Sequence, residues 1–432
     1  MASTSTPSTD GPVTLFFHDI TRVAGETITG QVDLNVAHAQ EDNLEHLQIR
    51  LKGTIHCKIT TRNGDTFIDH KQTIILFNTK VSLWDRGAAF PAPGSHILPC
   101  TFQFLLPETL PPSFHCDGYH RKATISYALE VEGKRDGFYR INRRIRRLIS
   151  VVPAASQEQL LARESLRQGW NGPWRSFTQE EKLRKGIWGE YSRAYVKLRT
   201  ADMAAYPIAT AIPFSFHVET YTKPMHKSDA PVDKHGKPLF PALPALSSDV
   251  KFTLLRRTEI RVRSHKRHLE DKFPLKGGLG DAARVAVVQQ VNDEPEWIPA
   301  SGPKDKKNHG IWKRAVHFHS AVAIPYAPTS STEIVDWQYN LLFEVPFPGV
   351  GNDLRLLVPV HLHPGSACPP PLLGVAESSN TTYADILPAG LLPPMVDLPP
   401  YAYTSNPKLM FDFHFRSYWT GEHHTWDVDE KK

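Results

Sequence analysis

The sequence is poor in residues that form disulfides and lacks the long apolar runs that cross membranes. It has four cysteines in 432 residues, and no stretch of about 18 apolar residues, the length that a membrane-spanning helix requires. The first twelve residues are polar and rich in Ser and Thr, without the apolar segment of a signal peptide. Sparse cysteines are typical of a reduced compartment, so we expect a cytoplasmic protein.

The sequence also lacks a large excess of charge of one sign. The chain has 50 Lys and Arg against 45 Asp and Glu, a formal net charge of +5, which is too balanced to indicate nucleic-acid binding. The sequence contains no glycine-rich phosphate loop, nucleophile elbow or paired-carboxylate signature. We therefore expect a protein that is not an enzyme, uses no cofactor and binds no nucleic acid.

Two motifs leave an enzyme as the weaker alternative. His317-Phe318-His319 and His361-Leu362-His363 would each place two imidazoles on one face of a strand. Neither pair has a Cys or carboxylate at ligand spacing, so we interpret them as surface histidines and expect no metal site. Cys116, with His115 or His120 as its partner, is a candidate nucleophile in a turn.

Alternation of apolar and polar residues is the strongest positive signal. In residues 47–59 every second residue is apolar or Gly, and residues 27–36, 98–106 and 123–131 repeat the pattern. With 36 prolines and 26 glycines between such segments, the pattern indicates many short strands joined by loops. It predicts an immunoglobulin-like antiparallel β-sandwich over residues 13–153.

The remainder of the chain predicts a second domain of the same class. Alternation resumes in Ile212–Val218 and Trp337–Val345, which indicates a second antiparallel β-sandwich over residues 194–364. Two polar or proline-rich segments, 223–248 and 264–310, are expected to be long loops. The predicted fold class is therefore all-β, with two tandem immunoglobulin-like sandwiches.

Three segments lie outside these sandwiches. Residues 1–12 are expected to be disordered, because they are polar and lack strand periodicity. Residues 154–193 are predicted to form a helical insertion: Ser156 and Gln159 fit a capping box, and a second helical stretch is expected from Thr178. Residues 365–432 form a proline-rich and aromatic tail that is expected to be extended.

Five arginines near the end of the first predicted sandwich form a candidate surface for acidic cargo or anionic lipid. They are Arg140, Arg143, Arg144, Arg146 and Arg147. On a strand, Arg143 and Arg147 would share one face and the other three the opposite face. Guanidinium groups pair with carboxylates and phosphates, and clustered cations attract anionic lipid. The alternative is a solvated edge strand whose charges discourage unwanted pairing.

Three segments give the chain a resemblance to a known family. They are Ala24–Val32, with a Gly-acidic opening before a strand; Leu47–Gly53, a strand that ends in apolar-x-Gly; and Pro93–Phe114, a Gly-led strand that runs into Leu-Pro and a Pro-Pro-Ser-Phe turn. In this order and spacing they resemble the N-terminal domain of arrestin-like proteins, the α-arrestins among them. Residues 339–359 look like the closing strands of the family's second domain.

The resemblance implies a cytosolic trafficking adaptor. Its α-arrestin relatives bind cytoplasmic parts of membrane proteins, recruit HECT-type ubiquitin ligases through WW domains and promote endocytosis from the plasma membrane or endosomes. Residues 398–401, which are Leu398, Pro399, Pro400 and Tyr401, fit the Leu-Pro-x-Tyr variant of the motif that WW domains bind, since a preformed proline helix loses little entropy on binding. The alternative is an arrestin-fold sorting scaffold that recruits no ligase.

Overall fold

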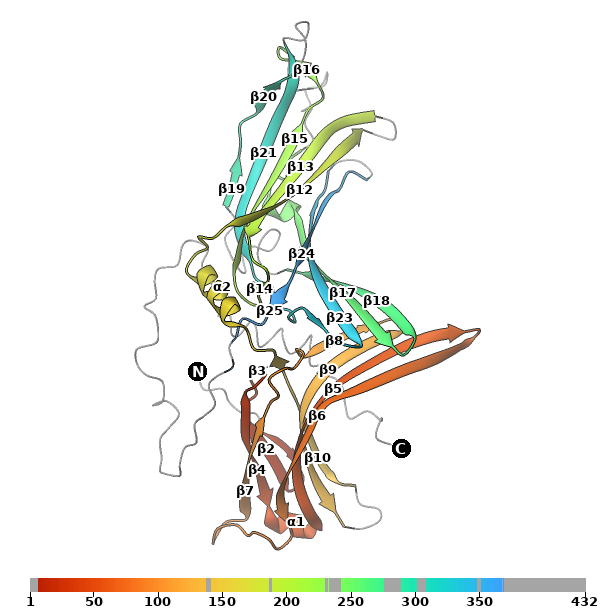
Figure 1. The fold of residues 1–432 in the computed structure, drawn as a ribbon, viewed down its shortest axis with the longest axis vertical. Coiled ribbons are helices and arrows are strands. Elements are labelled where there is room, and N and C mark those ends of the chain that lie inside the picture. The colour runs from red at the N-terminus through yellow and green to blue at the C-terminus, as the bar shows by residue number, and fades with distance from the viewer. Residues whose placement is uncertain are drawn as a thin grey trace.

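The computed structural model describes residues 7–136, 141–185, 189–229, 232, 242–275, 289–300, 308–347, 351–366 and 368. Figure 1 shows two β-sheet bodies arranged along the long axis, with helix α2 (Gln157–Arg167) beside their junction. The first body is drawn in red to orange and the second in yellow-green to blue. The predicted all-β architecture with two sandwiches is confirmed.

The first sandwich contains two antiparallel sheets within the described residues. One has the strand order β1-β2-β4-β7, and its strands are β1 (Ser8–Asp10), β2 (Val13–Phe17), β4 (Thr27–Asn35) and β7 (Ile97–Leu105). The other has the order β10-β9-β5-β6 with β8 also on β9, and its strands are β5 (Leu44–Asn63), β6 (Thr66–Asp85), β8 (Phe114–Gly118), β9 (Arg121–Arg135) and β10 (Arg143–Ile149). Helix α1 (Val36–Glu41) joins β4 to β5, and β3 (Arg22–Val23) pairs in parallel with β11 (Val151–Val152).

The core of this sandwich consists of the alternate apolar residues that the sequence pattern identified. On β5, Leu47, Ile49 and Leu51 are at most 1% exposed, while the residues between them are half-buried. A fully buried Leu or Ile contributes about 1.5–3 kcal/mol relative to an exposed one. The burial of this face fixes the register of β5 between β9 and β6, because a shift by one residue would expose the whole set.

The chain enters the first sandwich earlier than the sequence suggested. Residues 8–10, which fall in the segment expected to be disordered, form strand β1 and pair antiparallel with β2. Polarity misled the sequence interpretation here, because β1 is an edge strand with no buried side chain. Residues 1–6 lie outside the described part of the chain.

The predicted helical insertion is only half helical. Helix α2 begins with the expected capping box, in which the Ser156 hydroxyl accepts from the Gln159 amide and the Gln159 side chain accepts from the Ser156 amide. The prediction of a second helical stretch from Thr178 is wrong. Residues 174–185 form strand β12 (Trp174–Lys185), which pairs along its length with β13 (Gly189–Ala201). Pairing with a neighbouring strand overrides the helix propensity of a segment rich in Glu, Lys and Arg.

The second sandwich has the same layered plan. Its larger sheet has the order β12-β13-β15-β21-β16, and β19 and β20 also pair with β21. The strands of this sheet not yet given are β15 (Ile212–Tyr221), β16 (Met225–His226), β19 (Gln289–Asn292), β20 (Glu296–Pro299) and β21 (His309–Val322). The smaller sheet has the order β18-β17-β23-β22 with β24 on β23; its strands are β17 (Lys251–Val262), β18 (His265–Pro274), β22 (Ser330–Ser331), β23 (Val335–Val345) and β24 (Leu354–Val360). A 3₁₀ turn, η1 (Ser247–Asp249), precedes β17, and β14 (Tyr206–Pro207) pairs in parallel with β25 (Leu362–His363).

Part of the segment 264–310 that was expected to be a loop is strand. Strand β18 starts at His265 and pairs with β17 over ten residues, and β19 and β20 pair with β21. Strand β18 is an edge strand and carries many charged residues, which is how proteins commonly protect such edges. The same charges make it look like a loop in the sequence.

The two sandwiches meet through β8 and β5 of the first and β17 and β23 of the second. Phe114 on β8 stacks on Trp337 of β23, with ring centroids 3.9 Å apart. The Arg256 guanidinium on β17 lies 4.8 Å from the Phe114 ring centroid. The Cys57 thiol on β5 donates to the Ile334 carbonyl at 3.7 Å. Both aromatic rings are fully buried, so the junction is a packed extension of the cores.

Candidate functional site

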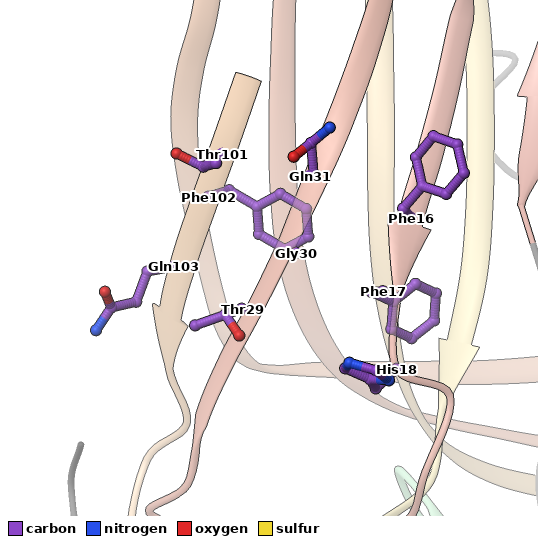
Figure 2. A pocket seen from close by; sticks show the side chains of 9 residues that line it. All are labelled: Phe16, Phe17, His18, Thr29, Gly30, Gln31, Thr101, Phe102 and Gln103. Carbon is purple, nitrogen blue, oxygen red and sulfur yellow. The ribbon is translucent and has the colours of Figure 1, made fainter. Parts of the chain in front are cut away.

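The outer surface of the β2-β4-β7 sheet carries an open hollow with a volume of about 520 Å³. Figure 2 shows side chains from these three strands around it. Its lining residues are Phe16, Phe17, His18, Thr29, Gly30, Gln31, Thr101, Phe102 and Gln103. We call this feature the sheet trough.

The floor of the sheet trough depends on Gly30. A Cβ atom at this position would lie 2.4 Å from the Phe102 ring and 2.7 Å from the Phe16 carbonyl oxygen. No side chain fits within those distances, so the close approach of β2, β4 and β7 at this point requires glycine. Gly30 belongs to the first of the three segments that carry the family resemblance.

The chemistry of the sheet trough suits binding better than catalysis. Among the described residues that line it, none is a carboxylate, lysine or arginine. Thr29, Gln31, Thr101 and Gln103 offer hydroxyl and amide groups on β4 and β7, the Phe16 ring lies beside them on β2, and the Gln31 side chain donates to Asp33 at 2.6 Å. Neutral hydrogen-bonding groups beside an aromatic ring can hold an extended chain. His18 is the one titratable side chain among the lining residues, and no carboxylate or thiol lines the trough with it.

The arginine row of the sequence analysis lies on β10, except for Arg140, which is outside the described residues. Arg144 and Arg146 point toward β9, where they pair with Glu132 at 3.1 Å and with Glu130 at 3.4 Å. These pairs agree with the register, which places each arginine directly opposite its glutamate. Cross-strand pairing of this kind stabilises the sheet by a few tenths of a kcal/mol to about 1 kcal/mol per pair.

Arg143 and Arg147 face the other way, toward the N-terminal strand. Arg143 pairs with Asp42 at 2.7 Å and with Asp10 at 3.2 Å. The Asp42 and Asp10 carboxylates raise the pKa of the Arg143 guanidinium, with hydrogen bonding by Asp42 as the largest cause. Arg147 pairs with Asp19 at 3.0 Å and lies over the Phe17 ring. The row therefore borders the sheet trough at Phe17, and carboxylates of this chain already contact these four arginines.

The histidine pairs do not form a metal site in the described part of the chain. His317 Nε2 contacts Asp293 at 2.9 Å, and its ring lies 4.0 Å from that of His217 on the neighbouring strand. Burial, and to a smaller extent the neighbouring His317, lowers the pKa of His217 to about 4. Of the other pair, His361 is exposed while His363 is 3% exposed.

The candidate nucleophile Cys116 is inside the molecule rather than in an open turn. It lies on β8 and is 2% exposed. Burial raises the pKa of the Cys116 thiol to about 12, and burial also raises that of Cys57 to about 12. A nucleophilic cysteine needs access and a lowered pKa, and Cys116 has neither.

One part of the interdomain contact could not be anticipated from local sequence. Arg256 is 5% exposed and donates from Nε and Nη2 to Asp271 on the adjacent strand, at 3.1 and 2.6 Å. Phe114 and Phe273 lie on either side of its guanidinium, with centroids 4.8 and 4.9 Å away. In sequence, Arg256 shares the apolar phase of β17 with Phe252 and Leu254, whereas Arg257 does not. The alternation could therefore have indicated that Arg256 is buried, but not that Asp271 and the two rings are its partners.

The motif Leu398–Tyr401 lies outside the described residues, as does most of the tail. The last described residues pack at the domain junction: the Ser366 carbonyl accepts from the Ala155 amide at 2.8 Å, and the Gly365 carbonyl accepts from Arg163. Gly365 and Ser366 therefore lie beside helix α2 and the residues that precede it. Among the described helices, none has the length and apolar character needed to traverse a bilayer.

Comparison with known proteins identifies the first sandwich. Residues 15–157 match the family described as "Arrestin (or S-antigen), N-terminal domain". No curated protein matches the chain. The matched residues begin on β2 and end just inside α2, and so include the sheet trough and the arginine row. Arrestin folds serve in general as adaptors or scaffolds that bind other proteins. Residues 15–157, which form the first sandwich, are therefore an arrestin-like N-terminal domain.

Proposed function

We propose that the protein is a trafficking adaptor that binds cytoplasmic parts of membrane proteins and recruits a HECT-type ubiquitin ligase for their ubiquitination and endocytosis. The observation that carries this proposal is an arrestin N-terminal domain at residues 15–157, joined in one chain to a Leu-Pro-Pro-Tyr sequence at residues 398–401. The first supplies surfaces for cargo. The second supplies a ligand for the WW domains of such a ligase.

Cargo would bind the first sandwich, at the sheet trough and the neighbouring arginine row. The trough offers hydroxyl and amide groups beside Phe16, and the row adds cations that suit acidic segments or anionic lipid headgroups. In this proposal the protein works in the cytoplasm and moves to the plasma membrane or endosomes with its cargo. No reaction step is assigned to it.

The ligase half of the proposal is tested by pulldown with purified WW domains of a HECT-type ligase. Tyr401→Ala should abolish capture of the full chain, because the tyrosine fills a pocket that the prolines do not reach. The matched control is Tyr403→Ala, which changes the same residue type two positions later and should leave capture intact. Equal capture of wild type and Tyr401→Ala would remove ligase recruitment from the function.

The alternative is an arrestin-fold sorting scaffold that recruits no ligase. A truncated variant that ends at Cys368 distinguishes the two functions, because it lacks residues 398–401 but keeps the Gly365 and Ser366 contacts at the domain junction. Proximity labelling in cells would identify the membrane proteins near each form. An adaptor loses ubiquitination of those neighbours on truncation, whereas a pure scaffold keeps both its neighbours and their modification state.

A further inference from the structure

Strand β7 lies at an edge of the first sandwich, on the outer margin of that body in Figure 1. Within the described part of the chain it pairs with β4 alone. The edge strands β6, β10, β12 and β18 each carry two or more charged side chains, which discourage pairing with another chain. The nine residues of β7, ILPCTFQFL, include none. An uncharged edge of this length is typical of a strand that pairs with a further chain.

Alternate residues of β7 turn their backbone groups away from β4. The Val36 amide donates to the His96 carbonyl at 2.9 Å, which places the even-numbered residues on the β4 side, because hydrogen-bond direction alternates along a strand. The Ile97 amide instead donates to the Ser95 hydroxyl at 3.1 Å, and that hydroxyl donates to the Ile97 carbonyl at 3.2 Å. The backbone groups of the odd-numbered residues therefore point to the free edge.

Pro99 agrees with an edge that faces away from β4. Proline has no N–H, and within sheets it is confined to edges where its nitrogen meets solvent. Pro99 is odd-numbered, so the β4 ladder loses no hydrogen bond to it. The N–H groups of Thr101, Gln103 and Leu105 then point to the same free edge, together with the carbonyls of these residues and of Pro99.

The exposed side chains of β7 are arranged symmetrically about Thr101. Ile97 at one end is 40% exposed, and Leu105 at the other end is 70% exposed. Thr101 lies midway between them, and the exposed residues on either side of it are uncharged. Two such strands can pair antiparallel with their apolar ends opposite each other, because a two-fold axis through Thr101 exchanges the two ends.

We propose that β7 is a dimerisation edge, and that its partner is β7 of a second copy of this chain, paired antiparallel across a two-fold axis at Thr101. In this register Ile97 lies opposite Leu105 of the second copy, and Pro99 lies opposite Gln103. The Thr101 amide donates to the carbonyl of its own counterpart. The Gln103 amide donates to the Pro99 carbonyl, so the proline needs no N–H of its own.

The apolar ends select this register. A shift by one residue would turn toward the partner the even-numbered residues, whose backbone groups already bond to β4. A shift by two residues would place Leu105 opposite Ser95 or Pro99 and remove its contact with Ile97. Apolar side chains directly opposite each other stabilise a strand pair, so the register centred on Thr101 is favoured.

A second copy suits this edge better than a charged segment of another protein. The edge has no cation or carboxylate to select such a segment, and two uncharged copies approach without repulsion. One strand pair buries less surface than a standard interface, so monomer and dimer should exchange in solution. Thr101 and Gln103 also line the sheet trough, and the dimer would bring the troughs of both copies together at the axis. This inference goes beyond the adaptor function and does not depend on it.

Sedimentation velocity of the full chain over about a hundredfold range of concentration tests the dimer. The sedimentation coefficient of the wild type should rise with concentration. Thr101→Lys should weaken dimerisation about tenfold or more, because the new charge faces its own counterpart on the axis. The control is Thr29→Lys, the same change at an exposed position of the inner strand β4, and it should dimerise as the wild type does. Equal losses in the two variants overturn the proposal.

A charge exchange at the axis tests the symmetry. Thr101→Asp alone should be as defective as Thr101→Lys, for the same reason. An equimolar mixture of the two variants should recover dimers, because opposite charges then meet on the axis. Recovery also shows that both variants are folded. A mixture of two folded variants that stays monomeric overturns the assignment of the axis to Thr101.

Cysteine pairing tests the register. Opposite residues of a hydrogen-bonded antiparallel pair have Cα atoms about 5.5 Å apart, which is within the range of a disulfide. Ile97→Cys mixed with Leu105→Cys should therefore give a covalent dimer on oxidation with copper phenanthroline. Each variant alone is the control, since it keeps the native cysteines but places its new thiols on opposite sides of the axis. Equal cross-linking of the mixture and the single variants overturns the register.

Other occupants of the edge give different results in the same measurements. A chain that ends at Cys368 should dimerise as the full chain does. If only the shortened chain dimerises, a segment of the tail covers β7, and the assignment to a second copy is overturned. If both forms are monomeric at every concentration, the edge is left to a strand of another protein, and the proposal is again overturned. WW-domain capture through Tyr401 does not involve β7, so this inference and the proposed function fail separately.

Discussion

Phe114 of the first sandwich stacks on Trp337 of the second, with centroids 3.9 Å apart and planes 15° from parallel. Both residues are fully buried, and the Trp337 Nε1 donates to the Pro328 carbonyl at 2.9 Å. The tryptophan is therefore fixed by its own domain, while the phenylalanine is the part that the first domain inserts.

Phe114→Ala should lower the free energy of unfolding by about 3–5 kcal/mol, because a buried ring is replaced by a cavity. The measurement is urea denaturation followed by tryptophan fluorescence. Phe90→Ala is the control, since Phe90 is 68% exposed. Small-angle scattering of Phe114→Ala should also show a wider spread of domain orientations. An unchanged denaturation midpoint would mean that the stacking contributes nothing to domain docking.

The ion pair of Arg256 and Asp271 gives a second prediction about the same junction. Asp271→Ala leaves a buried guanidinium between Phe114 and Phe273 without its carboxylate, and should destabilise the protein by about 3 kcal/mol. The double variant Arg256→Met/Asp271→Leu removes both charges and should recover most of that loss. Urea denaturation of the two variants decides the point; equal destabilisation would contradict it.

Most of the fold could be predicted from the period-two alternation of apolar and polar residues. Residues 47–59 were assigned correctly because one face of β5 is buried against the core and the other is not, and period-two alternation reports that difference directly. The Ser156 capping box was also visible in sequence, since its two hydrogen bonds join residues three apart. Signals of this kind are local, so one sequence contains them.

The errors have a common physical cause. Strands β12 and β18 are edge strands with charged residues, and their identity comes from pairing with β13 and β17 rather than from propensity. The partners of the arginine row are more distant still: Arg147 and Asp19 are 128 residues apart, and Arg143 and Asp10 are 133 apart. The arginines could be identified from the sequence, but their pairing with Asp10 and Asp19 near the N-terminus of the same chain could not.

Acid should destabilise the fold through His363. Burial, and to a lesser extent the neighbouring Arg163, lowers the pKa of His363 to about 4, whereas the unfolded value is about 6.5. Below about pH 6.5 the unfolded chain takes up a proton that the folded chain refuses, so the free energy of unfolding falls as the pH drops from about 6.5 to 4. At pH 5 the loss is on the order of 2 kcal/mol for this residue.

His363→Asn should flatten this pH dependence, because asparagine can accept from the Gly365 amide as His363 Nδ1 does at 3.2 Å but does not titrate. Urea midpoints at pH 7 and pH 5 measure the effect. His96→Asn is the control, since His96 is exposed, and it should keep the wild-type difference. The same difference in the wild type and in His363→Asn would assign the acid sensitivity to other groups, of which the half-buried His217, whose pKa is also lowered to about 4, is the next candidate.

Thiol reactivity should separate the two buried cysteines from ordinary ones. With their pKa values raised to about 12, Cys57 and Cys116 carry almost no thiolate at pH 8, and burial denies access to a reagent as well. Alkylation by iodoacetamide should therefore be at least roughly a hundredfold slower at both than in urea-unfolded protein, where all four thiols react. Peptide mass spectrometry after timed quenching resolves the individual sites. Rapid labelling of Cys116 in the folded chain would return it as a candidate nucleophile, because such a rate needs both an opening to solvent and a stabilised thiolate.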